Sequence, residues 1–261
     1  MMGAARVIAI LNQKGGTGKT TTAVNLGAGL SRQGRRVLLI DMDPLGGLTF
    51  SMGLDPWQAK PTIYEVITGR AGLAEATLRH EYPGGGYDFI PANLNLEGAE
   101  IELIGVRGRE LQLRKSISRA RSKYDYIIID AAPRLSILGM NGLYASSEVF
   151  LPLDSQYLGM NGLMLLLDSV KMANQELGHD LKVTGVILTK YADRYGLARE
   201  ISAIIEERFK KELFRTRIRN NVALAEAPSW GKDIFDYKPT SNGAKDYMAL
   251  AHEVIAQEGR I

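Results

Sequence analysis

A glycine-rich segment near the start of the chain has the residue types and spacing of a phosphate-binding loop. It follows an apolar run and consists of Lys14, Gly15, Gly16, Thr17, Gly18, Lys19, Thr20 and Thr21. Glycines can turn backbone N–H groups toward an anion, and the N-terminus of the following helix adds partial positive charge. In the pattern G-x-x-x-x-G-K-[ST], the lysine holds the β- and γ-phosphates and the hydroxyl group binds Mg²⁺. The segment therefore predicts a nucleotide site in which Lys19 contacts phosphates and Thr20 binds Mg²⁺.

The loop departs from the strict pattern at one position. A full match needs glycine where Gln13 stands, and Lys14 occupies one of the variable positions. The three glycines that are present still allow the backbone N–H groups to face inward, so the prediction of a phosphate site is unchanged.

Three aspartates come directly after, or close after, apolar runs that predict buried strands. Asp41 and Asp43 follow one run, and Asp130 ends another. A carboxylate at the end of a buried parallel strand lies where doubly wound sheets bind their ligands. For Asp41 and Asp43 there is also a purely structural alternative, because an aspartate before Pro44 can cap a helix or a turn.

The elements that must position these residues are indicated by apolar runs alternating with helical patterns. Strands are predicted at Val7–Leu11, Arg36–Ile40, Phe89–Ile90, Tyr126–Ile129, Val149–Leu153 and Val183–Leu188. Helices are predicted at Thr20–Arg32, Glu97–Ile104, Glu110–Ser122, Gly159–Gln175, Ala198–Lys211 and Gly243–Gln257. Strands alternating with helices predict an α/β fold with a doubly wound, mostly parallel sheet and helices on both faces. Because no linker interrupts the pattern, we expect one domain over residues 1–261.

Composition excludes several classes of site. The 261 residues include no cysteine, which rules out disulfides, cysteine-ligated metals and a thiol nucleophile. No run of about 18 apolar residues predicts a membrane span, and the N-terminus has no apolar stretch of the kind found in signal peptides. A cytoplasmic location is therefore the expectation.

Positive charge is concentrated in two zones, although the net charge is only +3. Residues 103–123 contain seven Arg or Lys and one Glu, and residues 190–219 contain nine basic and five acidic residues. Such zones suit an anionic polymer or an acidic partner. The alternative is a pair of solvated helix faces.

Four segments together resemble the deviant Walker A ATPases, and within them the ParA/Soj-type partition ATPases. They are the loop K-G-G-x-G-K-[ST], the run Asp41-Met42-Asp43-Pro44, the Walker-B-like run from Tyr124 to Asp130, and Leu224–Ser229. The resemblance spans nearly the whole chain. It implies a P-loop NTPase fold and an Mg²⁺-dependent ATPase that forms a homodimer when ATP is bound.

The resemblance also assigns roles to individual residues. It implies that Lys14 reaches the nucleotide of the partner subunit and that Asp43 positions the attacking water, so that Lys14, Asp43 and Lys19 are catalytic. It places Asp41 near Mg²⁺ and Asp130 on the water shell of the metal. The segment containing Asn220 and Asn221 aligns with a family segment that lines the adenine pocket, and which of the two contacts the base stays open.

The implied function is weak ATP hydrolysis, stimulated by a ParB-like partner, that drives partition or positioning of DNA or another cargo. The implied DNA binding is non-specific and double-stranded, with nucleoid association in the ATP state. A family arginine is replaced by Ala223, and the candidate DNA contacts are Arg194, Arg215, Arg217 and Arg219. On an extended segment the last three share one face. The alternatives are that they pair with Glu206, Glu207 or Glu212, or that they face the nucleotide.

Two other functions remain as competitors. A MinD-like membrane-cycling ATPase needs an amphipathic C-terminal helix rich in basic residues, whereas residues 247–261 contain one arginine and no lysine. Metal-cluster relatives need cysteines.

Two switch segments also differ from the family pattern, at Leu45-Gly46-Gly47 and at Asp130-Ala131-Ala132-Pro133-Arg134, and these changes concern the rate of hydrolysis more than nucleotide binding.

Overall fold

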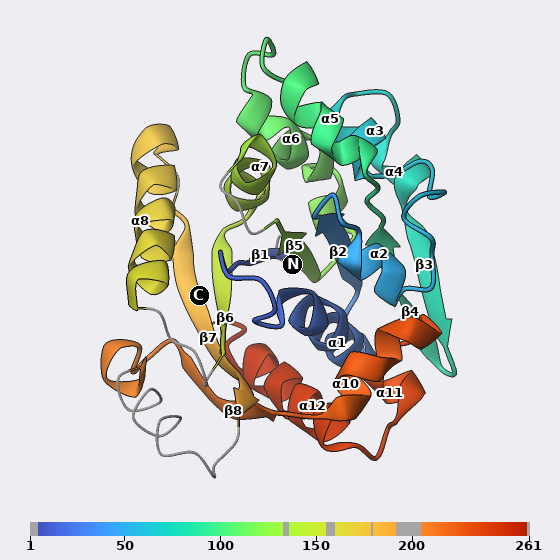
Figure 1. The fold of residues 1–261 in the computed structure, drawn as a ribbon, viewed down its shortest axis with the longest axis vertical. Helices are drawn as coiled ribbons and strands as arrows, with labels where there is room; N and C mark the ends of the chain where they lie inside the picture. The colour runs from blue at the N-terminus through green and yellow to red at the C-terminus, as the bar shows by residue number, and fades with distance from the viewer. Residues whose placement is uncertain (1–4, 133–135, 155–159, 179, 192–204, 260–261) are drawn as a thin grey trace.

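The computed structural model describes residues 5–132, 136–154, 160–178, 180–191 and 205–259. Eight strands form one sheet in the order β3-β4-β2-β5-β1-β6-β7-β8 (Figure 1). All neighbouring strands are parallel except the antiparallel pair β3 and β4. The strands are β1 Arg6–Ile10, β2 Val37–Met42, β3 Leu78–Tyr82, β4 Gly85–Ile90, β5 Tyr126–Ala131, β6 Glu148–Asp154, β7 Lys182–Tyr191 and β8 Leu213–Arg219.

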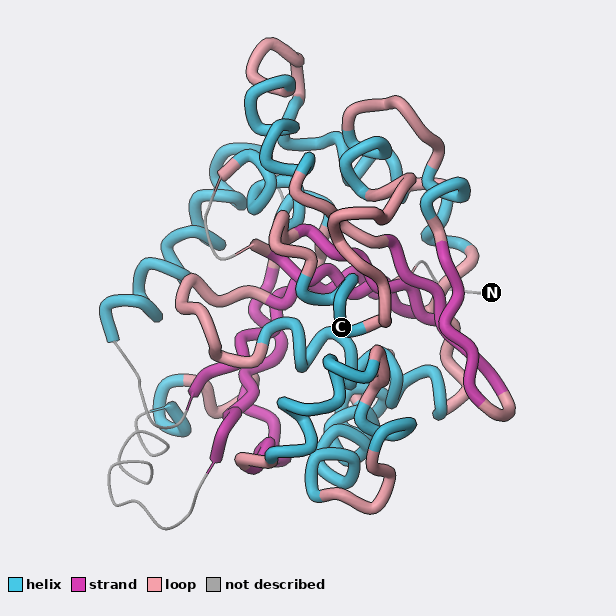
Figure 2. The backbone as a smooth tube through the Cα atoms, turned by 45° about the vertical axis from the view of Figure 1, so that its right-hand side comes forward, coloured by secondary structure: helices cyan, strands magenta, loops and turns pink. Residues whose placement is uncertain are grey.

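Helices cover both faces of this sheet, as Figure 2 shows for the backbone. They are α1 Lys19–Arg32, α2 Gly47–Ser51, α3 Ile63–Ile67, α4 Leu73–Ala76, α5 Asn95–Glu102, α6 Gln112–Ile117, α7 Ile137–Ala145, α8 Met160–Leu177, α10 Val222–Glu226, α11 Ile234–Tyr237 and α12 Asn242–Ala256. Three 3₁₀ turns accompany them, η1 Arg109–Leu111, η2 Ala120–Ser122 and η3 Ala227–Trp230. The predicted doubly wound, mostly parallel α/β fold is therefore confirmed.

The hydrophobic core explains why the central strands show no alternation of apolar and polar residues. In β2, Val37 and Leu39 pack with α1 and α12, whereas Leu38 and Ile40 pack with the layer that holds α3, α5, α6 and α7. All six residues of β2 and of β5 are buried. Strands buried on both faces need apolar side chains in both directions.

Several predicted elements differ from those observed. The helix predicted at Glu110–Ser122 is wrong as a single helix, because the segment consists of η1, α6 and η2 in succession. The short edge strand β3 was not predicted, since its residues Leu-Arg-His-Glu-Tyr are largely polar and none is fully buried. Half of the helix predicted at Ala198–Lys211 lies outside the described residues, and 205–208 are helical.

The C-terminal helix α12 packs on the body of the molecule. Its apolar residues Tyr247, Leu250 and Val254 are buried against the core that includes α1. In the part of the chain that the structure describes, no helix is long and apolar enough to cross a membrane.

Candidate nucleotide site at the carboxyl ends of the central strands

The glycine-rich loop joins β1 to α1 in the middle of the sheet. Gly18 is the N-cap of α1 and has a left-handed backbone with φ of 85°, a conformation that favours glycine. Lys14, Gly15 and Gly16 are exposed at the outer end of the loop, whereas Thr17 and Lys19 are buried. The structure therefore forms the strand, loop and helix arrangement in which backbone N–H groups can face a phosphate.

The loop is fastened to neighbouring strands by side-chain hydrogen bonds. Asn12 donates from Nδ2 to the carbonyl oxygen of Pro152 in β6 at 2.7 Å, and the N–H of Lys14 donates to Oδ1 of Asn12 at 3.0 Å. Thr189 in β7 donates to the carbonyl oxygen of Thr17 at 2.9 Å. These contacts hold the loop in a defined position before any ligand is bound.

The predicted metal residues Thr20 and Asp130 lie side by side. The hydroxyl of Thr20 donates to Oδ2 of Asp130 at 2.7 Å. Asp130 is 1 % exposed, and its other oxygen, Oδ1, is buried with no hydrogen-bond partner among the described residues. A buried carboxylate oxygen without a donor is costly unless it has a cation or water to bind. Hard oxygen donors of this kind fit Mg²⁺ and the water molecules it retains.

Asp41 lies next to Asp130, because the two residues are register partners in β2 and β5. Its Oδ2 accepts hydrogen bonds from the backbone N–H and the hydroxyl of Thr49, at 2.9 and 2.7 Å. Its Oδ1 accepts from the N–H of Asp43 at 3.2 Å. The carboxylate of Asp41 thus holds Thr49 in α2, a structural role of the kind that the alternative of a helix or turn cap expected.

Burial dominates the electrostatics of this pair. Desolvation raises the pKa of Asp130, and the nearby carboxylate of Asp41 raises it further, while Thr20 and Lys19 act in the opposite direction. Desolvation also raises the pKa of Asp41 against the effect of its hydrogen bonds with Thr49. Perturbed pKa values of this kind cluster at functional sites, and a bound cation would stabilise the charged form of these two carboxyl groups.

The segment after Asp43 closes over the loop. Gly46 has φ of 64°, and a Cβ at this residue would lie 2.7 Å from Cβ of Pro56. A Cβ on Gly47 would lie 3.3 Å from Oγ1 of Thr20. The left-handed backbone and the close approach of Pro56 therefore favour glycine at residue 46, whereas a side chain at residue 47 would need only a small displacement of Thr20. Asp43 itself is half-buried, and its Oδ1 accepts from the N–H of Leu45 at 3.0 Å.

A hollow of about 140 Å³ opens beside the loop, where the resemblance predicts the adenine pocket. Gly18 and Thr21 line it together with Asn220 and Asn221. The side chain of Asn221 caps α10 by accepting from the N–H of Ala223 at 2.9 Å. Asn220 is held through its backbone N–H, which donates to the carbonyl oxygen of Tyr191.

Two residues of β7 that the sequence did not single out also lie at the loop. Thr189 and Lys190 line the hollow, and Lys190 has φ of 50°, a left-handed backbone that is unusual for a residue other than glycine. The Nζ of Lys190 lies 3.5 Å from Oδ2 of Asp154 at the end of β6. No local motif marks these positions, because they reach the loop only through the order of the strands.

The candidate DNA-binding arginines are placed differently from one another. Arg217 forms an ion pair with Glu206, one of the predicted alternatives, and Arg219 pairs with Asp246 at 2.5 Å and lines the hollow. Arg215 is exposed and its backbone N–H donates to Glu253, while its side chain has no hydrogen bond or ion pair with any described residue. Arg194 lies outside the described residues.

Comparison with known proteins places the chain in a family. A model described as an AAA domain matches residues 5–183. The Sporulation initiation inhibitor protein Soj of Bacillus subtilis is 40% identical over 251 residues, which cover 96% of this chain and 98% of Soj. The Chromosome partitioning protein ParA of Caulobacter vibrioides is 39% identical over 255 residues, covering 97% and 95%. The chain belongs to the ParA/Soj family of P-loop ATPases.

Solved structures agree with this family. One of them is a Mycobacterium smegmatis protein named cobyrinic acid a,c-diamide synthase, with bound ATP analogue and magnesium. It is 33% identical to this chain, with a TM-score of 0.84, and the match covers 97% of this chain and 95% of that protein. The cell division ATPase MinD of Pyrococcus furiosus is 25% identical with a TM-score of 0.79, covering 97% and 99%. The family is thus a positioning ATPase family that includes both partition and cell-division members.

Proposed function

We propose that this ParA/Soj family member is an Mg²⁺-dependent ATPase that forms a homodimer around ATP, binds double-stranded DNA without sequence preference, and positions DNA or another cargo. The proposal rests on the meeting of Lys19, Thr20 and Asp130 at the carboxyl ends of β1 and β5. This arrangement supplies a phosphate cation, a hydroxyl group and a buried carboxylate at one point, as phosphoryl transfer requires.

Residues of the chain would perform distinct parts of ATP hydrolysis. Lys19 and the N–H groups of the loop bind and orient the phosphates. Thr20 and Oδ1 of Asp130 would hold Mg²⁺, which neutralises charge on the phosphate oxygens when it is bound. Asp43, which is half-buried close to the loop, accepts a hydrogen bond from the attacking water and fixes its direction.

Lys14 is the residue that would make hydrolysis depend on dimerisation. It stands at the exposed outer end of the loop, where its side chain can reach a second copy of the protein. A cation supplied from a partner subunit stabilises the charge that develops on the phosphates in the transition state. In this proposal the monomer binds ATP but hydrolyses it very slowly, and a ParB-like partner stimulates the dimer.

DNA binding would use phosphate contacts rather than base contacts. The supporting observation is the exposed Arg215 on β8, in a segment whose net charge over residues 190–219 is positive. Contacts to phosphates position a protein on DNA without reading its sequence. The ATP-bound dimer presents two copies of this surface and would associate with the nucleoid.

One experiment separates partition from a membrane cycle. The protein is sedimented with plasmid DNA and, separately, with anionic liposomes, each in the presence of ADP or of ATP. Sedimentation with DNA only in ATP supports the proposal. Sedimentation with liposomes and not with DNA would favour a MinD-like cycle instead.

A further inference from the structure

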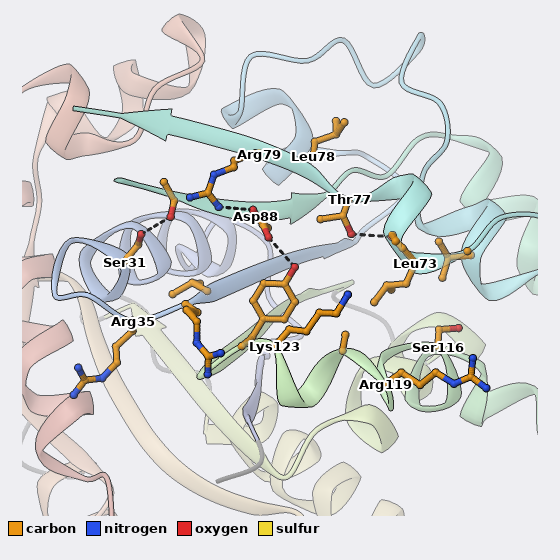
Figure 3. A pocket seen from close by; sticks show the side chains of 18 of the residues that line it. Ser31, Arg35, Leu73, Thr77, Leu78, Arg79, Asp88, Ser116, Arg119 and Lys123 are labelled. Atoms are coloured by element: carbon orange, nitrogen blue, oxygen red, sulfur yellow. Dashed lines mark hydrogen bonds and ion pairs between the residues drawn. The ribbon is translucent and has the colours of Figure 1, made fainter. Parts of the chain in front are cut away.

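A second and larger hollow, of about 1290 Å³, lies at the end of the sheet opposite the nucleotide site (Figure 3). Its lining includes Val37 at the start of β2, Gly85 at the start of β4, and Tyr124 just before β5. Asp41 and Asp130 lie near the other ends of β2 and β5. Strands of this length span about 17–20 Å, so an occupant of this hollow would not touch the nucleotide.

One wall of the hollow carries three unneutralised cations. Lys115, Arg119 and Lys123 line it at a spacing of four residues, from α6 to just after η2, and all three are exposed. None of their side chains has a hydrogen bond or ion pair with any residue that the structure describes. Like charges gathered on one wall repel one another.

No carboxylate in the described lining is available to balance these charges. The one acidic lining residue, Asp88, already accepts from Arg79 at 2.8 Å and from the hydroxyl of Tyr124 at 2.7 Å, as Figure 3 shows. The other two cations of the lining, Arg35 and Arg36, form ion pairs with acidic residues outside it. The positive charge of the wall is therefore directed at whatever enters the hollow.

Apolar side chains lie on the other side of the hollow, beside Thr77, Arg79 and Asp88. Leu73 and Ala74 of α4 line it together with Leu78 of β3, which is 38% exposed. Figure 3 shows Leu73 and Leu78 on the side opposite Arg119 and Lys123. At about 1290 Å³ the hollow exceeds the roughly 300–1,000 Å³ of usual small-molecule sites. A larger occupant, with one charged edge and one apolar edge, fits it better.

We propose that this hollow binds an extended acidic segment of a partner protein in which acidic residues alternate with apolar ones. Successive side chains of an extended peptide point in opposite directions, so the acidic side chains would face the cations and the apolar ones Leu73 and Leu78. Alternate residues of such a peptide are about 6.6 Å apart. The three cations stand at intervals of four residues along one wall, so a run of acidic side chains at this spacing can face more than one of them.

The position of the hollow has a consequence for the proposed ATP cycle. A dimer that forms through the phosphate-binding loops leaves the opposite end of each sheet exposed. The acidic segment would therefore bind each subunit in both nucleotide states, as an attachment point for cargo rather than as a stimulator of hydrolysis. This consequence depends on the proposed dimer, whereas the binding of the peptide does not.

The test uses fluorescence anisotropy with a labelled peptide of about ten residues in which Glu alternates with Leu. A second peptide has the same composition, with the Glu and Leu residues sorted into two blocks. The unaltered protein should bind the alternating peptide at least about tenfold more tightly than the block peptide, and more weakly as salt increases. Equal affinity for both peptides, or no binding of the alternating one, would overturn the proposal.

Substitutions locate the site. The affinity for the acidic peptide should fall at least about tenfold in the triple variant Lys115→Glu, Arg119→Glu, Lys123→Glu. The same variant should bind the counterpart peptide in which Lys replaces Glu. The matched control is Arg107→Glu with Arg114→Glu, two basic residues of the same zone that do not line the hollow. ATP affinity should be unchanged in both variants, which verifies that they fold. A triple variant that keeps the acidic peptide but loses duplex DNA would identify the wall as a DNA surface and refute the peptide.

Discussion

The hydroxyl group of Thr20 donates a 2.7 Å hydrogen bond to Oδ2 of Asp130, a residue 110 positions later in the chain. This contact joins the first turn of α1 to the end of β5 and leaves Oδ1 of Asp130 buried without a donor from the described residues. The nucleotide site is therefore built with one carboxylate oxygen held by the protein and the other available to a ligand.

Replacing Asp130 with asparagine should stabilise the ligand-free protein. The buried carboxyl group has its pKa raised to about 8, so the folded state binds more protons than the unfolded state at pH values between the ordinary carboxyl range and about 8. The free energy of unfolding contributed by this group then falls as pH rises through that range.

Urea denaturation of the ligand-free protein across a pH series measures this effect. In the Asp130→Asn variant the decline of stability with pH should be shallower, and the free energy of unfolding near neutral pH should be about 1–3 kcal/mol higher. ATP binding should depend less on Mg²⁺, because Thr20 alone of the two proposed metal residues is unchanged. An unchanged pH slope would show that Asp130 is not the group responsible.

Lys19→Ala should abolish tight ATP binding, because the phosphates lose their main fixed cation in a partly desolvated loop. A loss of charge-assisted hydrogen bonds of this kind predicts at least about a 100-fold weaker affinity by calorimetry. An affinity equal to that of the unaltered protein would refute the assignment of the loop.

Lys14→Ala should still bind nucleotide, because Lys14 stands at the exposed end of the loop and Lys19 is retained. ATP-dependent dimerisation and hydrolysis should both be lost, since the proposed contact of Lys14 is with the phosphates of the other subunit. Analytical ultracentrifugation in ATP measures the dimer. If the Lys14→Ala variant sediments as a dimer in ATP, as the unaltered protein does, Lys14 does not act across the subunits.

Asp43→Ala should bind ATP, accumulate as the ATP-bound dimer and hydrolyse slowly, because no carboxylate orients the water. The matched variant is Asp43→Asn, whose side-chain oxygen can still accept from the N–H of Leu45 and maintain the turn. Phosphate release should be slow in both variants. If only the alanine variant is slow, Asp43 serves the turn and not the water.

Arg215→Ala should weaken DNA binding more than Arg217→Ala, because Arg217 is already paired with Glu206 while the Arg215 side chain is exposed. Each phosphate contact contributes about 0.9 to the log-log salt slope, so removing Arg215 from both subunits should flatten the slope by about two units. Two unrelated duplexes should be affected alike. If the slope stays as it was in an ATP-dimerising Arg215→Ala variant, the DNA surface lies elsewhere.

Much of the candidate site could be predicted because its signals are local. The glycines, Lys19 and Thr20 lie within one short segment, and continuous apolar runs such as Val37–Ile40 indicate the buried strands. The helix Glu110–Ser122 was mispredicted for a related reason. Its apolar positions have helical spacing, but the 3₁₀ turns at either end of α6 depend on how the segment packs, which spacing does not record.

The residue types of the phosphate site and the parallel α/β architecture could be predicted from the amino-acid sequence, because loop conformation and strand burial depend on nearby residues. Which distant residues meet depends on how the chain folds. Strand order brings Asp130 to Thr20, Thr189 to Thr17 and Lys190 to Asp154, and the packing of α12 against β8 pairs Arg219 with Asp246. The fold also leaves Lys115, Arg119 and Lys123 facing an open hollow across from Leu73. Contacts between segments depend on how the layers pack, and a periodic pattern within one segment carries no information about the partner that packing will bring to it.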